Sequence, residues 1–115
     1  MELPDYKDVQ GPVLMLNMLK FADRTYYFQT YLPAFKEAIK FLGIQDVKIR
    51  LVCDVAANVL SPAEEDWDAI LLVEYPSAQA FKTIAESEAY RDIADPHRLK
   101  ATAKLHLYMT TPVDL

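Results

Sequence analysis

The stretch Trp67-Asp-Ala-Ile-Leu-Leu-Val-Glu-Tyr-Pro-Ser-Ala-Gln-Ala-Phe81 decides the fold class of this chain. Its first nine residues are mostly β-branched, aromatic or apolar, which is typical of a buried strand. Pro76 cannot donate a hydrogen bond to a neighbouring strand, so we expect the strand to end there. Ser77 can then cap the N-terminus of a helix. A strand followed at once by a capped helix predicts helices layered on a sheet.

The remaining elements can be placed around this stretch by hydrophobic periodicity. Strands are predicted at 13–21, 47–60 and 105–110, and helices at 25–42, 77–94 and, as one short turn, 97–103. We expect Pro33 to kink the first helix, a break near Ser87 to divide the second, and Asp95-Pro96 to interrupt the chain again. Asp23 or Thr25 should cap the first helix, and Gly43 should end it.

The order β-α-β-β-α-β predicts a ferredoxin-like α+β fold with helices on one face of a four-stranded antiparallel sheet. At 115 residues we expect a single domain, with 1–11 as an N-terminal tail. Period-two alternation gives each strand an apolar side and a mixed side. On this pattern Leu51, Cys53 and Trp67 belong to the apolar side, whereas Val52, Ile70 and Leu72 lie among charged residues on the other. The open side then favours a homodimer in which two sheets meet face to face.

Composition excludes several classes of function. A net charge of −5 without a basic cluster argues against a nucleic-acid partner. No apolar run is long enough to span a membrane, and the N-terminus lacks the pattern of a signal peptide, so we expect a cytoplasmic protein. Two histidines and one cysteine without ligand spacing argue against a metal site. Only two glycines are present, so we expect no phosphate-binding loop and no cofactor.

Two stretches carry a resemblance to a known family. One is Pro12-Val-Leu-Met-Leu-Asn-Met-Leu-Lys-Phe21, and the other runs from Val59-Leu-Ser-Pro62 through Glu65-Asp-Trp-Asp68 and Val73-Glu-Tyr-Pro-Ser77 to Tyr90 and His97-Arg98. They resemble the bacterial family called domain of unknown function 1330, in the dimeric α/β-barrel superfamily. The resemblance implies a ferredoxin-like protomer and a homodimer whose two sheets form a barrel. It implies no catalytic residues, because no activity is established for that family.

Two neighbouring residues near the end of the second helical region are candidates for chemistry. His97 could act as a general acid or base, because imidazole titrates near neutral pH. Its alternative is a structural histidine that satisfies groups at a helix end. Arg98 could bind a carboxylate through two hydrogen bonds. Alternatively it pairs with Glu88 or Asp92 on the surface.

Three further residues could line a binding pocket. Asn17 interrupts an apolar strand and needs a hydrogen-bond partner, so it either orients a ligand carbonyl or fixes a strand irregularity. Trp67 and Tyr31 could form the walls, although a tryptophan is more often a core side chain. The sequence thus predicts a small-molecule pocket between sheet and helices, performing metal-free acid/base or oxygen chemistry on an apolar or aromatic metabolite. The alternative is a non-enzymatic dimer that binds a metabolite or serves in assembly.

Overall fold

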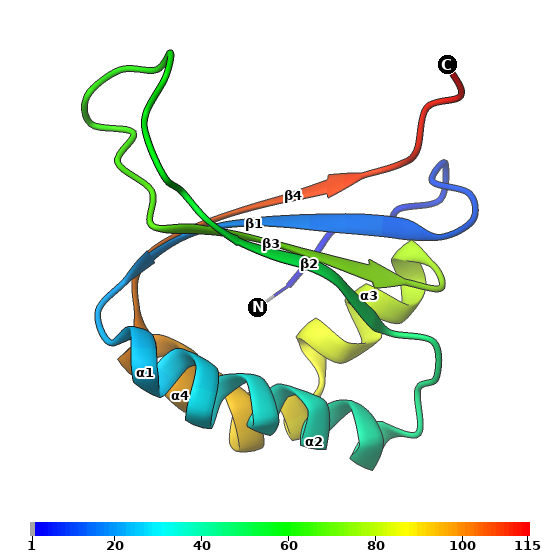
Figure 1. Cartoon of the computed structure of the whole chain (residues 1–115). Helices are drawn as coiled ribbons and strands as arrows, with labels where there is room; N and C mark the ends of the chain where they lie inside the picture. Colours follow the sequence, from blue (N-terminus) through cyan, green and yellow to red (C-terminus); the bar gives the residue numbers. More distant parts are fainter. Residues whose placement is uncertain (1) are drawn as a thin grey trace.

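The computed structural model describes residues 2–115 and forms two layers (Figure 1). Its strands are β1 (Val13–Phe21), β2 (Lys48–Asp54), β3 (Ala69–Tyr75) and β4 (Thr102–Thr110). They pair antiparallel in the order β2-β3-β1-β4. The helices lie together against one face of this sheet, below it in Figure 1. The predicted ferredoxin-like α+β fold is confirmed.

The first helical region begins and ends where its capping residues predict. It runs through α1 (Arg24–Tyr26), a π-helical turn η1 (Tyr27–Tyr31) and α2 (Leu32–Leu42). The Asp23 side chain accepts a hydrogen bond from the backbone N–H of Tyr26. Gly43 adopts a left-handed conformation with φ 71°, which glycine reaches without steric cost. Its N–H then satisfies carbonyl oxygens of the last turn.

The second helical region is divided at Ser87, as predicted. Helix α3 (Ala78–Glu86) begins at Ser77, whose hydroxyl accepts from the N–H of Ala80. The hydroxyl of Ser87 donates to the carbonyl of Ile84 at 2.7 Å and accepts from the N–H of Tyr90 at 3.0 Å. One serine therefore ends one helix and caps the next.

Both prolines inside helical regions follow a π-helical turn. The turn η1 precedes Pro33, and η2 (Tyr90–Ala94) precedes Pro96 of α4 (Asp95–Ala101). A proline has no N–H and would clash with the carbonyl four residues earlier in a regular helix. The π turn widens the helix just before it. Pro96 therefore does not interrupt the helix, contrary to the prediction. Strand β4 begins directly after α4, at Thr102 instead of at 105.

The core lies between the helices and the sheet face turned towards them. The strand side chains buried on this helix-facing side are Val13, Met15, Leu19, Ala69, Leu71, Val73 and Tyr75. The opposite face, which we call the open face, carries Leu14, Leu16, Met18, Ile70, Leu72, His106 and Tyr108, according to the strand register. No helix covers it in the part of the chain that Figure 1 describes.

Strand β2 departs from the prediction in its register and its length. The pairing with β3 shifts between Ile49 and Leu51, so Leu51 lies opposite Leu72 and Cys53 opposite Ile70. Leu51 and Cys53 consequently turn to the open face, and Cys53 is exposed instead of buried. The strand also ends at Asp54, because its only partner β3 begins at Ala69. Residues 55–60 belong to the loop that rises above the sheet (Figure 1).

Candidate functional site

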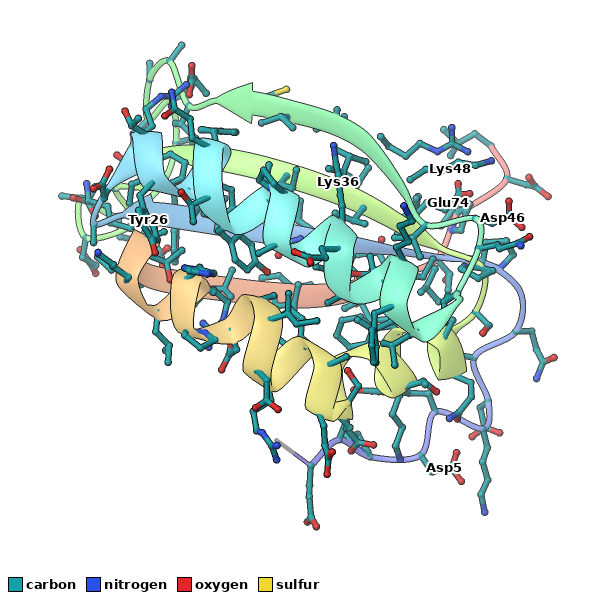
Figure 2. All side chains as sticks on the ribbon, turned by 90° about the horizontal axis from the view of Figure 1, so that it is seen from below. Asp5, Tyr26, Lys36, Asp46, Lys48 and Glu74 are labelled. Atoms are coloured by element: carbon teal, nitrogen blue, oxygen red, sulfur yellow. The ribbon has the colours of Figure 1, made fainter. Side chains whose placement is uncertain are left out.

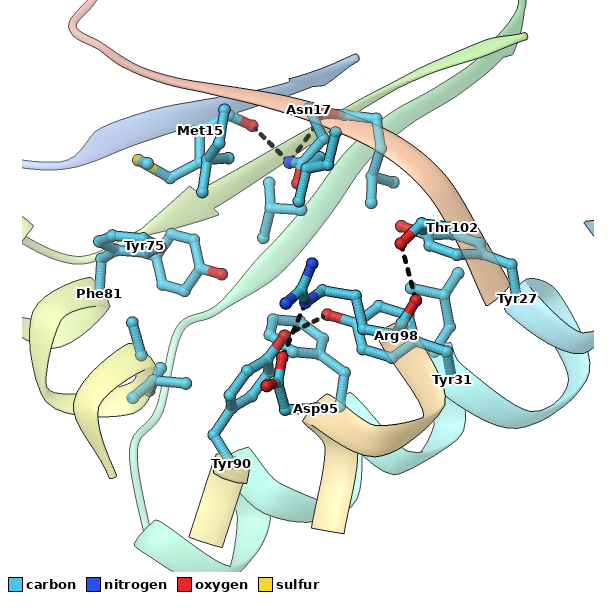
Figure 3. Close-up of a pocket in the computed structure, with 18 of the residues that line it drawn as sticks. Met15, Asn17, Tyr27, Tyr31, Tyr75, Phe81, Tyr90, Asp95, Arg98 and Thr102 are labelled. Atoms are coloured by element: carbon cyan, nitrogen blue, oxygen red, sulfur yellow. Dashed lines mark hydrogen bonds and ion pairs between the residues drawn. The ribbon is translucent and has the colours of Figure 1, made fainter. Parts of the chain in front are cut away.

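A cavity of about 600 Å³ lies between the sheet and the helices, and we call it the chamber (Figure 3). Its volume falls in the range that small-molecule sites occupy. Apolar side chains form most of the wall, among them Met15, Leu71, Val73, Phe81, Ile84 and Leu105. The polar lining consists of Tyr6, Asn17, Tyr27, Tyr31, Tyr75, Tyr90, Asp95, Arg98, Thr102 and Lys104. A few polar groups in an apolar cavity fix the orientation of a ligand.

Arg98 is the cation directed into the chamber. Lys104 also lines the chamber, but its Nζ lies over the ring of Trp67, 4.5 Å from the centroid. Helix α4 presents it one turn after Asp95, and the Arg98 Nε–H donates to Asp95 Oδ1 at 2.7 Å. Both side chains are largely buried, with 22% and 30% of their surface exposed. In Figure 3 the outer nitrogens of the guanidinium point into the centre of the chamber. A buried charge that is paired on one side only can accept an oppositely charged or polar ligand group on the other.

Four tyrosines surround this guanidinium. The hydroxyls of Tyr31 and Tyr90 are hydrogen-bonded at 2.8 Å, and the Tyr75 hydroxyl points into the chamber (Figure 3). Burial raises the pKa of Tyr31 far above its ordinary value, and it also raises the pKa values of Tyr27, Tyr75 and Tyr90. All four therefore remain neutral phenols at physiological pH, and each keeps an O–H group that can donate a hydrogen bond.

Asn17 lines the chamber on the side formed by the sheet. It lies on the helix-facing side of β1, and its Nδ2 donates to the carbonyls of Met15 and Leu71, each at 3.2 Å (Figure 3). The bond to Leu71 links β1 to β3, and the bond to Met15 stays within β1. The side-chain carbonyl remains an acceptor beside the chamber. These bonds supply the partners that a polar amide needs inside an apolar strand, and the ligand contact of Asn17 stays a prediction.

The structure places Trp67 away from the chamber. It precedes β3, so the alternation of that strand does not extend to it. The centroid of its ring lies 4.5 Å from that of His106. Trp67 also lines a second hollow of about 350 Å³, together with Met18 and Tyr108. Residues of the open face and of the loop before β3 form this hollow. Trp67 is therefore not a wall of the chamber, in contrast to the prediction.

His97 also lies outside the residues that line the chamber. Its Nδ1 shares a hydrogen bond with the hydroxyl of Tyr26 at 2.5 Å, and the centroids of the two rings are 5.6 Å apart. This contact joins α4 to α1. The contact is structural, but its partner is a phenol hydroxyl and not the helix-end carbonyls that the sequence offered as the alternative.

The N-terminal segment closes part of the chamber. The side chains of Leu3 and Tyr6 contribute to the lining, and the N–H of Leu3 donates to Glu86 Oε2 at 2.8 Å. Figure 2, seen from the helix side, shows this segment, with Asp5 labelled, running past the helices. The tail predicted at 1–11 therefore packs on its own chain over its described residues, 2–11.

Sequence reasoning predicted Asn17, Tyr31 and Arg98, and the structure brings these three together. It missed Tyr27, Tyr75, Tyr90 and Asp95 as lining residues. One signal could have found two of them. In Tyr27–Pro33 and Tyr90–Pro96, an aromatic residue stands six positions before a proline inside a helical region, and each begins a π turn that faces the sheet.

Within 2–115, no group of three or more His, Cys, Asp or Glu side chains is placed to hold a metal ion. No helix in that range has the length and apolar character needed to cross a membrane.

Comparison with known proteins supports the fold. A protein of unknown function from Rhodopseudomonas palustris has a TM-score of 0.76 at 22% identity, over 98% of this chain and 97% of that one. A member of the ethyl tert-butyl ether D family from Bacillus halodurans has a TM-score of 0.60 at 15% identity, over 90% and 100%. A DABB family protein with a ferredoxin-like fold from Mesorhizobium loti has a TM-score of 0.55 at 13% identity, over 91% and 100%.

These structures share the ferredoxin-like architecture of this chain over nearly its whole length. No family model and no curated protein matches the sequence. The likeness to domain of unknown function 1330 therefore stays a resemblance.

Proposed function

We propose that this protein binds a small apolar or aromatic metabolite in the chamber, with an oxygen-bearing group of the ligand held by Arg98. The observation that carries the proposal is the guanidinium directed into an apolar cavity of about 600 Å³. A cation is costly to bury without a partner. Asp95 supplies a partner through one nitrogen only, Nε. A ligand oxygen at the two Nη nitrogens would add hydrogen bonds to Arg98 on the side turned to the chamber.

The chemistry we propose for this site is metal-free acid/base or oxygen chemistry. Arg98 would stabilise negative charge that develops on the bound oxygen. Asp95 has a second carboxylate oxygen that can accept a proton, and the phenol of Tyr75 can donate a hydrogen bond. The sequence predicts His97 as the proton shuttle. In that role, His97 would need a path for the proton from its hydrogen bond with Tyr26 into the chamber.

The second candidate is binding without turnover, and a specific observation favours it. Burial holds the phenols of the chamber in their neutral form, so none of these tyrosines is poised to give up a proton near neutral pH. A metabolite carrier or a ligand-dependent assembly module needs only the shape of the chamber and the charge of Arg98.

We also propose that the protein acts as a cytoplasmic homodimer joined through the open faces of two sheets. Apolar side chains gather on this face, with Tyr108 52% exposed and Leu51 43% exposed. Oppositely charged residues stand beside them, such as Arg50 and Glu74, which form a pair at 2.9 Å. Continuous apolar surface on a small domain is typical of an interaction site. The resemblance to dimeric α/β-barrel proteins supports the same arrangement.

Native mass spectrometry before and after denaturation tests the binding proposal, and two adjacent residues provide the variants. Leu107 lines the chamber, whereas Tyr108 lies on the open face. We expect gently purified protein to carry a small molecule that denaturation releases. The L107W variant, whose larger ring takes up part of the chamber, should lose most of that mass, and Y108W should keep it.

Either of two results would contradict the proposal. Wild-type protein could be empty after gentle purification and remain empty after incubation with a metabolite extract. Alternatively, L107W could retain the bound mass as fully as Y108W does, which would place the ligand outside the chamber. Circular dichroism of both variants confirms that the comparison is made between folded proteins.

A further inference from the structure

We infer that the ligand is an apolar or aromatic carboxylic acid, whose carboxylate forms a bidentate pair with Arg98. The inference rests on the proposed function and names the chemical class of its ligand. It follows from three properties of the chamber: the direction in which the guanidinium is fixed, the excess of hydrogen-bond donors around it, and the apolar wall opposite.

The direction of the guanidinium is set by Asp95. Because Asp95 Oδ1 accepts from the Nε–H of Arg98 at 2.7 Å, the planar group cannot rotate freely. The edge formed by its two Nη atoms is then turned into the chamber (Figure 3). Parallel N–H groups on that edge match the two oxygens of a carboxylate. A ketone or an amide oxygen would satisfy only part of this fork.

The surroundings of the fork are rich in donors. Tyr75 points its hydroxyl into the same space (Figure 3). The hydroxyls of Tyr31 and Tyr90 lie beside it, 2.8 Å apart, so one O–H donates to the other and one remains for a ligand. Phenols that stay protonated add hydrogen bonds to an anion without adding negative charge. The charge of Asp95 is already compensated by Arg98, so the ligand carboxylate meets the cation and these donors together.

The remainder of the chamber specifies the body of the ligand. Beyond the polar cluster, the wall is formed by side chains such as Leu71, Val73, Phe81 and Ile84, which offer no charged partner. A cavity of about 600 Å³ accommodates a body of one or two rings or a branched chain. An acid that is polar throughout, such as a dicarboxylate, would leave its second charge unpaired against this wall.

Isothermal titration calorimetry with 2-naphthoate and 2-naphthamide tests the inference. The two probes share the bicyclic body and differ in the charged group. We expect naphthoate to bind wild-type protein at least about tenfold more tightly, since hydrogen bonds between charged partners are that strong. R98M should lose this advantage or reverse it, because Asp95 is then left beside the ligand without its cation. R91M is the matched control, because Arg91 is exposed and paired with Asp92 outside the chamber.

A second variant protects the test against misfolding of R98M. Y75F removes one donor hydroxyl and keeps the ring, and we expect it to weaken naphthoate several-fold while it leaves naphthamide within about twofold. Equal binding of the two probes to wild-type protein would overturn the inference and leave the proposed function standing. Full retention of naphthoate binding by R98M would also overturn the inference. Failure of both probes to bind would contradict the proposed function itself.

Discussion

The substitution Leu19→Ala is expected to lower the free energy of unfolding by about 3 kcal/mol, near the middle of the range for buried leucines. Leu19 is 1% exposed and lies in the central strand β1, paired with Ala69 on one side and Leu105 on the other. Close-packed neighbours of this kind cannot move in to fill the space that the lost methyl groups leave. Urea denaturation followed by circular dichroism measures the change.

Leu60→Ala is the matched control for this measurement. Leu60 is 94% exposed in the loop between β2 and β3, so its truncation should change the free energy of unfolding by less than about 0.5 kcal/mol. Equal losses for the two variants would mean that the core does not centre on β1. The account of the fold given above would then be wrong.

The substitution Leu72→Glu is expected to convert the proposed homodimer into a monomer. Leu72 is half-buried at the centre of the open face, between Leu16 of β1 and Leu51 of β2. In a face-to-face dimer the two-fold axis brings each copy of this region against the other. A carboxylate placed there would be buried without a partner, which is far more costly than leaving it in water. Sedimentation velocity at several protein concentrations measures the change.

Thr83→Glu supplies the control, because Thr83 is exposed on α3, on the helix side of the molecule. It adds the same charge and should leave the sedimentation coefficient unchanged. A wild-type protein that sediments as a monomer at all concentrations would contradict the dimer. So would an L72E variant that sediments as the wild-type dimer does.

Local signals predicted much of the fold. The apolar run of β1 was placed at its observed bounds, Val13–Phe21. Gly43 ends α2 and Ser77 begins α3 as their capping preferences indicate. These features depend on residues within a few positions of each other, so one sequence contains the information. The same holds for the break at Ser87, where a single hydroxyl serves both helix ends.

Features that depend on distant parts of the chain were not predictable in the same way. The bulge after Ile49 shifts the register of β2 against β3, and it moves Leu51 and Cys53 to the open face. Nothing in the alternating pattern of β2 shows that shift. Trp67 was assigned to the wrong side because β3 begins two residues after it. A shift of two residues in the position of a strand boundary is enough to change which cavity a side chain lines.

The candidate site combines both kinds of information. Asn17 was identifiable because a polar amide in an apolar strand needs a partner, and Arg98 because His97-Arg98 belongs to the stretch that carries the family resemblance. Their convergence with Tyr27, Tyr75 and Tyr90 depends on how helices pack on the sheet. The π turns η1 and η2 contribute to this convergence, since Tyr27, Tyr31 and Tyr90 all lie within them.

The most direct test of the account is an NMR measurement that locates a bound ligand relative to the two faces of the sheet. With methyl-labelled protein and 2-naphthoate, we expect intermolecular nuclear Overhauser effects from the ring protons to the methyl groups of Leu71, Ile84 and Leu105, which line the chamber. Leu72 follows Leu71 directly and points to the opposite face. Contacts to Leu72 and Leu16 without contacts to Leu71 would place the ligand on the open face and contradict the chamber as the binding site.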